Sequence, residues 1–151
     1  MTPDTKLADL GLTLPDAPAP AANYVPYVIS GTHLYISGQI SQGAEGLIVG
    51  KVGQDLDVPA AQAAAQTCAL AILAQAKAAL GDLSKIKRVV KLTGFVNSTP
   101  DFTDQPEVIN GASDLFVAVL GEAGRHARAA VSAGALPRGV AVEIDAVIEI
   151  V

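Results

Sequence analysis

Residues 142–150 alternate between apolar and polar side chains. One face of the extended chain is apolar throughout, with Val142, Ile144, Ala146, Ile148 and Ile150. The other face carries Glu143, Asp145 and Glu149 beside Val147. A period of two predicts a β-strand with one buried face, because successive side chains point to opposite sides of a sheet. The rest of the chain must therefore supply neighbouring strands and a layer that covers the apolar face.

Two helices are predicted to form that layer. The longer one has Asp57 as its N-cap, Pro59 in its first turn and Gly81 as its stop. Its apolar residues recur at helical spacing, at positions 65, 69, 72, 73, 76 and 80. The second helix is expected from about residue 106 to residue 120, and Gly121 ends it.

Further strands are predicted at 27–30, 33–37, 86–97 and 126–133, and the glycine-rich loop 41–53 is expected to hold one more short strand. Gly31 and Thr32 form a tight turn between the first two strands. Residues 3–12 are expected to form a short helix, and the proline-rich residues 14–20 are expected to be extended. The element order predicts one α+β domain at 23–151, with two helices on one face of a mixed sheet, after an N-terminal arm at 1–22.

Composition suggests an oligomer. Half of the 151 residues are hydrophobic, 17% are charged, and the mean hydropathy is +0.40. A monomer of this size exposes a large share of its surface to water and would need more polar side chains there. The net charge of −5, without a basic run, disfavours nucleic acid as a partner.

Cys68 is the one cysteine, which excludes an intramolecular disulfide and fits a reducing compartment. The N-terminal residues lack the pattern of a secretory signal, so we expect a cytoplasmic protein. The apolar stretch 59–80 is rich in alanine and is interrupted by three glutamines and Lys77, which favours a packed helix over a membrane span. Membranes are therefore not expected as partners.

Common catalytic and metal motifs do not fit. Residues 46–52 resemble a phosphate loop but have three residues between the glycines, and Val52 stands where a hydroxyl would meet a metal ion. The two histidines, His33 and His126, do not have the spacing of metal ligands. Cys68 lies among alanines, as is typical of an inert buried thiol.

The predicted strand at 126–133 has a polar face made of His126, Arg128, Ala130 and Ser132. Glu143 begins the polar face of the last strand. If the two strands are neighbours, a guanidinium and a carboxylate could line one polar patch on an apolar scaffold. The alternative interpretation is a solvated strand face with a weak ion pair across it.

The ordered set of motifs resembles the RidA/YjgF family, formerly described as liver perchloric-acid-soluble proteins. The C-terminal signature is carried by Ala127-Arg128-Ala-Ala-Val131, Gly134-Ala-Leu136-Pro137 and Val142-Glu143-Ile144. Ser37-Gly38-Gln39, Tyr24 thirteen residues before that serine, and Lys91-Leu-Thr-Gly-Phe95-Val96 match as well. The similarity covers the chain after residue 21.

The resemblance implies a chorismate-mutase-like α+β fold and a homotrimer whose sheets pack around a central barrel, with clefts between subunits. It also implies hydrolysis of reactive 2-imino and enamine acids to 2-oxo acids and ammonia, without a metal or a cofactor. By position, Arg128 would bind the substrate carboxylate and Glu143 would orient the attacking water. The pocket would be lined by Tyr24, Ser37 and Gly38, and by the backbone of Ala130 at the imine nitrogen.

Two departures from the family pattern lie next to Arg128. Ala130 replaces the cysteine of many members, and His126 stands where proline or alanine is usual, so His126 is expected at the pocket mouth. These changes leave a second hypothesis open, a non-catalytic trimer that binds a small carboxylate for regulation or stress response. A third, the endoribonuclease or translation-inhibitor activity of the older family names, is disfavoured by the acidic charge and the scarcity of aromatic residues.

Overall fold

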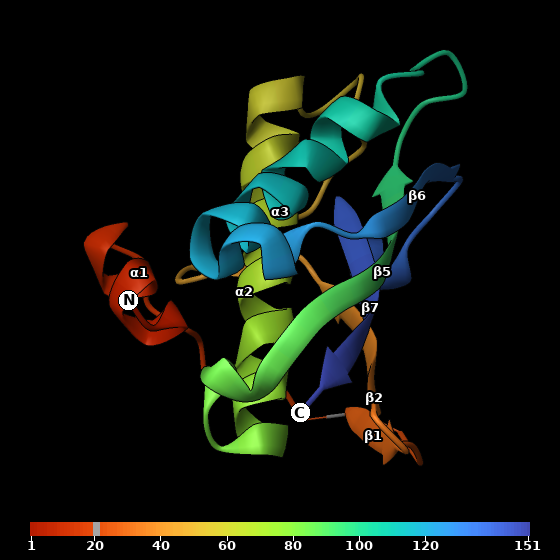
Figure 1. The fold of residues 1–151 in the computed structure, drawn as a ribbon. Coiled ribbons are helices and arrows are strands. Elements are labelled where there is room, and N and C mark those ends of the chain that lie inside the picture. The colour runs from red at the N-terminus through yellow and green to blue at the C-terminus, as the bar shows by residue number, and fades with distance from the viewer. Residues whose placement is uncertain (20–21) are drawn as a thin grey trace.

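The computed structural model describes residues 1–19 and 22–151 as a sheet with helices on one face (Figure 1). The five strands lie in the spatial order β1 (Tyr27–Ser30), β2 (His33–Ile40), β7 (Val142–Ile150), β5 (Ile86–Asn97) and β6 (Ala127–Ala133). Only β5 and β6 pair in parallel, and the other three pairs are antiparallel. The predicted α+β fold with a mixed sheet is confirmed.

The long helix α2 (Val58–Leu80) forms as the sequence predicts. The Asp57 carboxylate accepts the Ala60 N–H at 2.9 Å, and Gly81 ends the helix with a φ of 81°, a conformation that glycine adopts without strain. Its length and hydropathy would also suit a membrane span, but 56% of its most apolar window is buried inside the fold. It packs as a core helix against the sheet and α3 (Gln105–Leu120).

Ladder pairing assigns each side chain to one face of the sheet, because paired residues point the same way. Ile144, Ala146 and Ile148 of β7 face the helices and are at most 2% exposed. Glu143 and Asp145 point to the other side, which no helix covers (Figure 1). We call this side the open face.

The strand β2 runs past the predicted residue 37 to Ile40, across an irregularity in its pairing with β7 between Ile36 and Gln39. The loop after it contains two short strands, β3 (Gln42–Gly43) and β4 (Gly46–Leu47), where one was expected. Lys51 fixes this loop to the ends of β5 and β6, because its ammonium donates to Asn97 Oδ1 at 2.9 Å and to the Gly134 carbonyl at 2.7 Å.

The short helix α1 (Pro3–Asp9) forms within the predicted range and packs against α3. Leu7 is 3% exposed and belongs to the main core. The Lys77 ammonium lies 2.8 Å from the Asp4 carboxylate, an exposed pair that contributes less than about 1 kcal/mol. The predicted extended segment 14–20 ends at residue 20, and residues 20–21 lie outside the described residues.

Candidate functional site

Arg128 lies on the edge strand β6 and faces the helices. It pairs with the buried Leu92 of β5, and its guanidinium reaches α3. One terminal nitrogen donates to Ser113 Oγ at 3.0 Å and the other to the Pro106 carbonyl at 3.1 Å. Both acceptors are neutral, and within residues 1–19 and 22–151 Arg128 forms no ion pair. Its charge is therefore available to an anion.

His126 lies beside Arg128 and shares Ser113 with it. Its Nε2 is 2.9 Å from Ser113 Oγ, and its Nδ1 is 2.6 Å from the Gly124 carbonyl oxygen. Partial burial lowers the pKa of His126, the Gly124 contact raises it, and the Arg128 charge lowers it, with a net decrease. The neutral ring is favoured at pH 7.

Small side chains let α3 come close to the sheet near Arg128. Ala130 pairs with Gly94 of β5, and a Cβ on Gly94 would lie 2.5 Å from Ile109 Cδ1 of α3. Ser113 is one turn after Ile109 on the same side of that helix. The close approach at Gly94 thus brings the Ser113 hydroxyl within reach of β6.

Glu143 lies on the open face, over the backbone of β2. A Cβ on Gly38 would overlap the Glu143 carboxylate, so the glycine leaves the space that this side chain occupies. Burial raises the pKa of Glu143, and the nearby Asp145 charge raises it further. This shift brings the carboxyl closer to the range of a general base at neutral pH.

Ser37, the residue before Gly38 in β2, holds the chain segment that contains Tyr24. The Ser37 hydroxyl donates to the Val25 carbonyl at 2.9 Å, and the Ser37 N–H donates to the Pro26 carbonyl at 2.9 Å. These bonds hold the segment before β1 beside the irregular part of β2. Tyr24 lies in this segment and is 54% exposed.

The sequence-predicted site residues therefore form two groups. We call His126, Arg128 and Ala130 with Ser113 the Arg128 half-site, and Tyr24, Ser37, Gly38 and Glu143 the Glu143 half-site. The strands of Arg128 and Glu143 are not neighbours, because β5 lies between them, so the condition for one polar patch within the chain is not met. The two side chains also point to opposite faces of the sheet, so one chain does not bring them together.

Ser113 was not among the predicted site residues. The sequence does contain a signal for it: it is a polar residue between Ile109 and Phe116, both of which are buried on the sheet side of α3. Cys68, in contrast, behaves as predicted. It is buried, its thiol donates to the Val142 carbonyl at 3.5 Å, and burial raises the pKa of the thiol.

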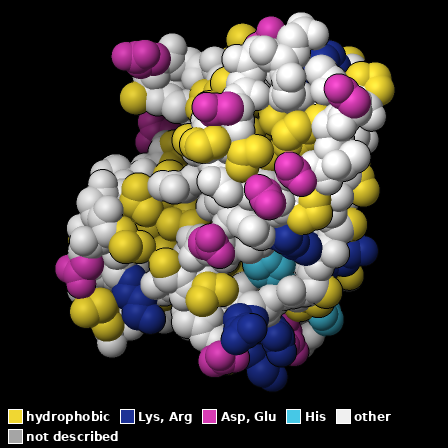
Figure 2. Space-filling view, turned by 90° about the horizontal axis from the view of Figure 1, so that it is seen from above, with side chains coloured by type: hydrophobic (Ala, Val, Ile, Leu, Met, Phe, Trp, Pro, Cys, Tyr) yellow, Lys and Arg dark blue, Asp and Glu magenta, His cyan; other side chains and the backbone are white. Residues whose placement is uncertain are grey.

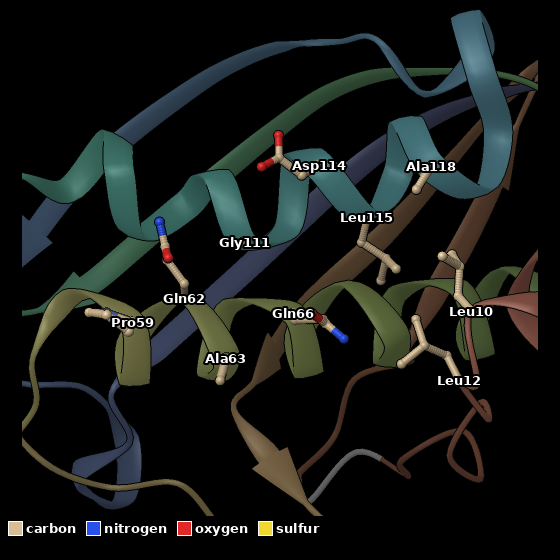
Figure 3. Close-up of a pocket in the computed structure, with 10 residues that line it drawn as sticks. All are labelled: Leu10, Leu12, Pro59, Gln62, Ala63, Gln66, Gly111, Asp114, Leu115 and Ala118. Atoms are coloured by element: carbon tan, nitrogen blue, oxygen red, sulfur yellow. The ribbon is translucent and has the colours of Figure 1, made fainter.

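A groove of about 540 Å³ lies between α2, α3 and the N-terminal segment (Figure 3). Leu10 and Leu12 border it on one side, and Gln62, Gln66 and Asp114 are its polar residues. None of the residues of either half-site lines it. The groove is therefore a feature of the helix layer, separate from Arg128 and Glu143.

Gly38→Ala is predicted to displace the Glu143 carboxylate without unfolding the protein. The obstacle is the flexible end of a side chain, so the new methyl group pushes it toward water and the pKa of Glu143 falls toward its ordinary value. Carboxyl ¹³C titration by NMR would measure this shift. Gly43→Ala is the matched control, since its Cβ would meet only Ile48 at 3.9 Å. An unchanged Glu143 titration in Gly38→Ala would contradict the placement of the carboxylate.

Comparison with known proteins identifies the family. Residues 4–145 match a family model described as "YjgF/chorismate mutase-like, putative endoribonuclease". The chain belongs to the YjgF/RidA-like family. The match begins inside the predicted N-terminal arm, so α1 is part of what this chain shares with the family.

Three relatives illustrate the similarity. Protein TCP17 of Trypanosoma cruzi is 54% identical, over 95% of this chain and 91% of its own. The crystal structure of Atu1372 from Agrobacterium tumefaciens, a protein of unknown function, is 55% identical with a TM-score of 0.92, over 99% of this chain and 94% of its own. RidA from an Antarctic Psychrobacter is 33% identical with a TM-score of 0.63, over 89% of this chain and 94% of its own. The predicted family resemblance is confirmed, and members of the family are small oligomers.

Proposed function

We propose that the protein hydrolyses 2-imino and enamine acids to 2-oxo acids and ammonia, at sites that two subunits of a homotrimer form together. The observation that carries this proposal is the separation of the half-sites. Arg128 and Glu143 have no partner of opposite charge in the described part of the chain, and they lie on opposite faces of one sheet. Contact between unlike surfaces of neighbouring copies can pair them and close into a ring.

The open face supports an assembled state. Val28 and Tyr35 pair across β1 and β2 on this face, and Val131 lies on it at the opposite edge, paired with Phe95. Val28, Tyr35 and Val131 are 43–49% exposed in the single chain. An apolar sheet surface of this kind is favourably covered by another copy, as the composition of the chain suggests.

The chemistry follows from the two charged groups. The planar guanidinium of Arg128 matches a carboxylate through two parallel hydrogen bonds and so fixes the substrate. Glu143 accepts a proton from water while the water oxygen bonds to the iminium carbon and gives a tetrahedral carbinolamine. The nitrogen then takes back the proton that Glu143 holds. The C–N bond breaks as the hydroxyl oxygen forms the C=O bond and gives its proton to Glu143, so that ammonia leaves and the 2-oxo acid remains. An iminium carbon is already electrophilic, so positioning is the main task of the protein.

An RNA substrate is less compatible with the surface. Acidic side chains are spread over the face in Figure 2, and Lys and Arg form only small groups there. With ten basic and fifteen acidic residues, the chain lacks the positive field that phosphate binding uses. Imino-acid chemistry needs only one cation in the pocket, which Arg128 supplies.

The test is the rate at which the protein consumes 2-iminopropanoate released by a pyridoxal-phosphate enzyme. We expect turnover by the wild type and a loss of about 100-fold or more in kcat/KM for Arg128→Ala, because the substrate carboxylate loses its charged partner. Turnover that survives Arg128→Ala would contradict the role of the arginine. Binding of pyruvate without turnover would instead support a non-catalytic carboxylate-binding trimer.

A further inference from the structure

A continuous chain of hydrogen bonds leads from the Gly124 carbonyl to the Arg128 guanidinium. It passes through the His126 ring, at 2.6 Å from the carbonyl oxygen, and then through Ser113 Oγ, at 2.9 Å from the ring and 3.0 Å from Arg128. We call this chain the Ser113–His126 relay. It joins Ser113, in the middle of α3, to the edge strand β6 and to the turn before that strand.

The direction of each hydrogen bond in the relay is determined by its ends. A carbonyl oxygen only accepts, so His126 Nδ1 carries the proton. In the neutral ring Nε2 is then an acceptor, and the Ser113 hydroxyl donates to it. Arg128 only donates, so the Ser113 oxygen accepts from it. Each hydrogen bond in the relay therefore pairs one donor with one acceptor, and no two donors face each other.

The packing around the relay restricts its geometry. A Cβ on Gly124 would overlap the Phe116 carbonyl, so Gly124 lies directly against α3 and its own carbonyl has a fixed place. The Phe116 ring contacts the His126 ring edge-on, with centroids 6.0 Å apart and an angle of 77°. The His126 ring therefore has a defined orientation before it bonds to Ser113.

We propose that Ser113 and His126 are positioning residues that hold the Arg128 guanidinium ready for two-point binding of the substrate carboxylate. This inference rests on the proposed function. The departure of this chain from the family pattern at position 126 then has a purpose, because the histidine supplies the acceptor that orients Ser113.

Neutral partners suit this task better than an acidic one. A carboxylate from the protein would bind Arg128 in the manner of the substrate and would compete with it. The Ser113 oxygen and the Pro106 carbonyl use two of the five guanidinium N–H groups and leave three, enough for a two-point contact. Fixing the long side chain in advance also reduces the entropy lost when a ligand binds.

Three variants test the relay, with pyruvate as the carboxylate probe. Ser113→Ala removes the acceptor of Arg128, and His126→Phe keeps a ring against Phe116 but removes both nitrogens. Each is expected to raise the Kd for pyruvate roughly ten-fold. The double variant is expected to be no worse than either single one, because both act through one chain of bonds. Ser132→Ala is the control, since Ser132 is on the same face of β6 but bonds to Ser98 at 2.7 Å, and its Kd should equal that of the wild type.

A second measurement separates failure of the relay from failure of the proposed function. At pH 7.5 the ¹⁵N shifts of the His126 ring should show a protonated Nδ1 and an unprotonated Nε2, and the Arg128 Nε–H signal should be ordered in the wild type and mobile in Ser113→Ala. The opposite tautomer, or wild-type affinity in both single variants while Arg128→Ala fails to bind, would overturn the positioning role. A wild type that neither binds pyruvate nor hydrolyses imines would refute the function, and the NMR signals would still decide whether the relay exists.

Discussion

Arg128→Ala and Glu143→Gln proteins, each inactive alone, are expected to regain activity when their subunits share one oligomer. The half-sites of one chain lie on opposite faces of its sheet, so in the proposed homotrimer each complete site would take Arg128 from one subunit and Glu143 from the next. In a mixed ring of three, one site receives its Arg128 from a Glu143→Gln subunit and its Glu143 from an Arg128→Ala subunit. Both groups are intact there, and about one third of wild-type activity should return.

The experiment uses co-expression with two different affinity tags and sequential purification, so that only mixed oligomers are assayed with 2-iminopropanoate. The controls are the oligomers made of a single variant, purified with the same tags. Each should be at least about 100-fold less active than the wild type. The recovered fraction also reports the number of copies, since a mixed dimer would regain about one half. Mixed oligomers that are as inactive as their parents would refute a shared site.

The limits of the sequence prediction are clearest at β6 and β7. Their period-two patterns correctly identify a polar face on each strand, with Arg128 on one and Glu143 on the other. Local pattern does not tell which face the helices cover. On β7 the apolar face packs under α2, whereas on β6 the polar face lies under α3 and Val131 faces outward. The two polar faces therefore point in opposite directions.

The sequence predicts the bounds of these strands but not their order in the sheet. The bounds 86–97 and 142–150 are confirmed, because the buried positions of both strands are occupied by apolar residues at a recognisable spacing. The insertion of β5 between β6 and β7 depends on the path of the chain through α3, which residue type does not encode. Ser113 was missed for a related reason: its role arises only when Gly94 lets α3 approach the sheet.

A close backbone contact between two helices, at Gly111, predicts a large loss of stability on substitution. Gly111 of α3 lies against the backbone of α2, where an added Cβ would overlap the Gln62 carbonyl oxygen and lie 2.8 Å from its carbon. Backbone atoms cannot rotate away as a side chain can, so Gly111→Ala must push the two helices apart. Overpacking costs about 1–3 kcal/mol, and the gain of about 1 kcal/mol from alanine in a helix offsets only part of this cost, so we expect a net loss of roughly 1–2 kcal/mol.

Thermal unfolding at one fixed protein concentration measures this loss, and the melting temperature should fall by roughly 5 °C for a chain of this size. Gly134→Ala is the matched control, because no atom lies within 4 Å of its added Cβ, and it should melt as the wild type does. The displaced α3 also carries Ser113 and Pro106, the two partners of Arg128, so folded Gly111→Ala should bind pyruvate more weakly than Gly134→Ala. Wild-type stability in Gly111→Ala would show that the helices are not in backbone contact.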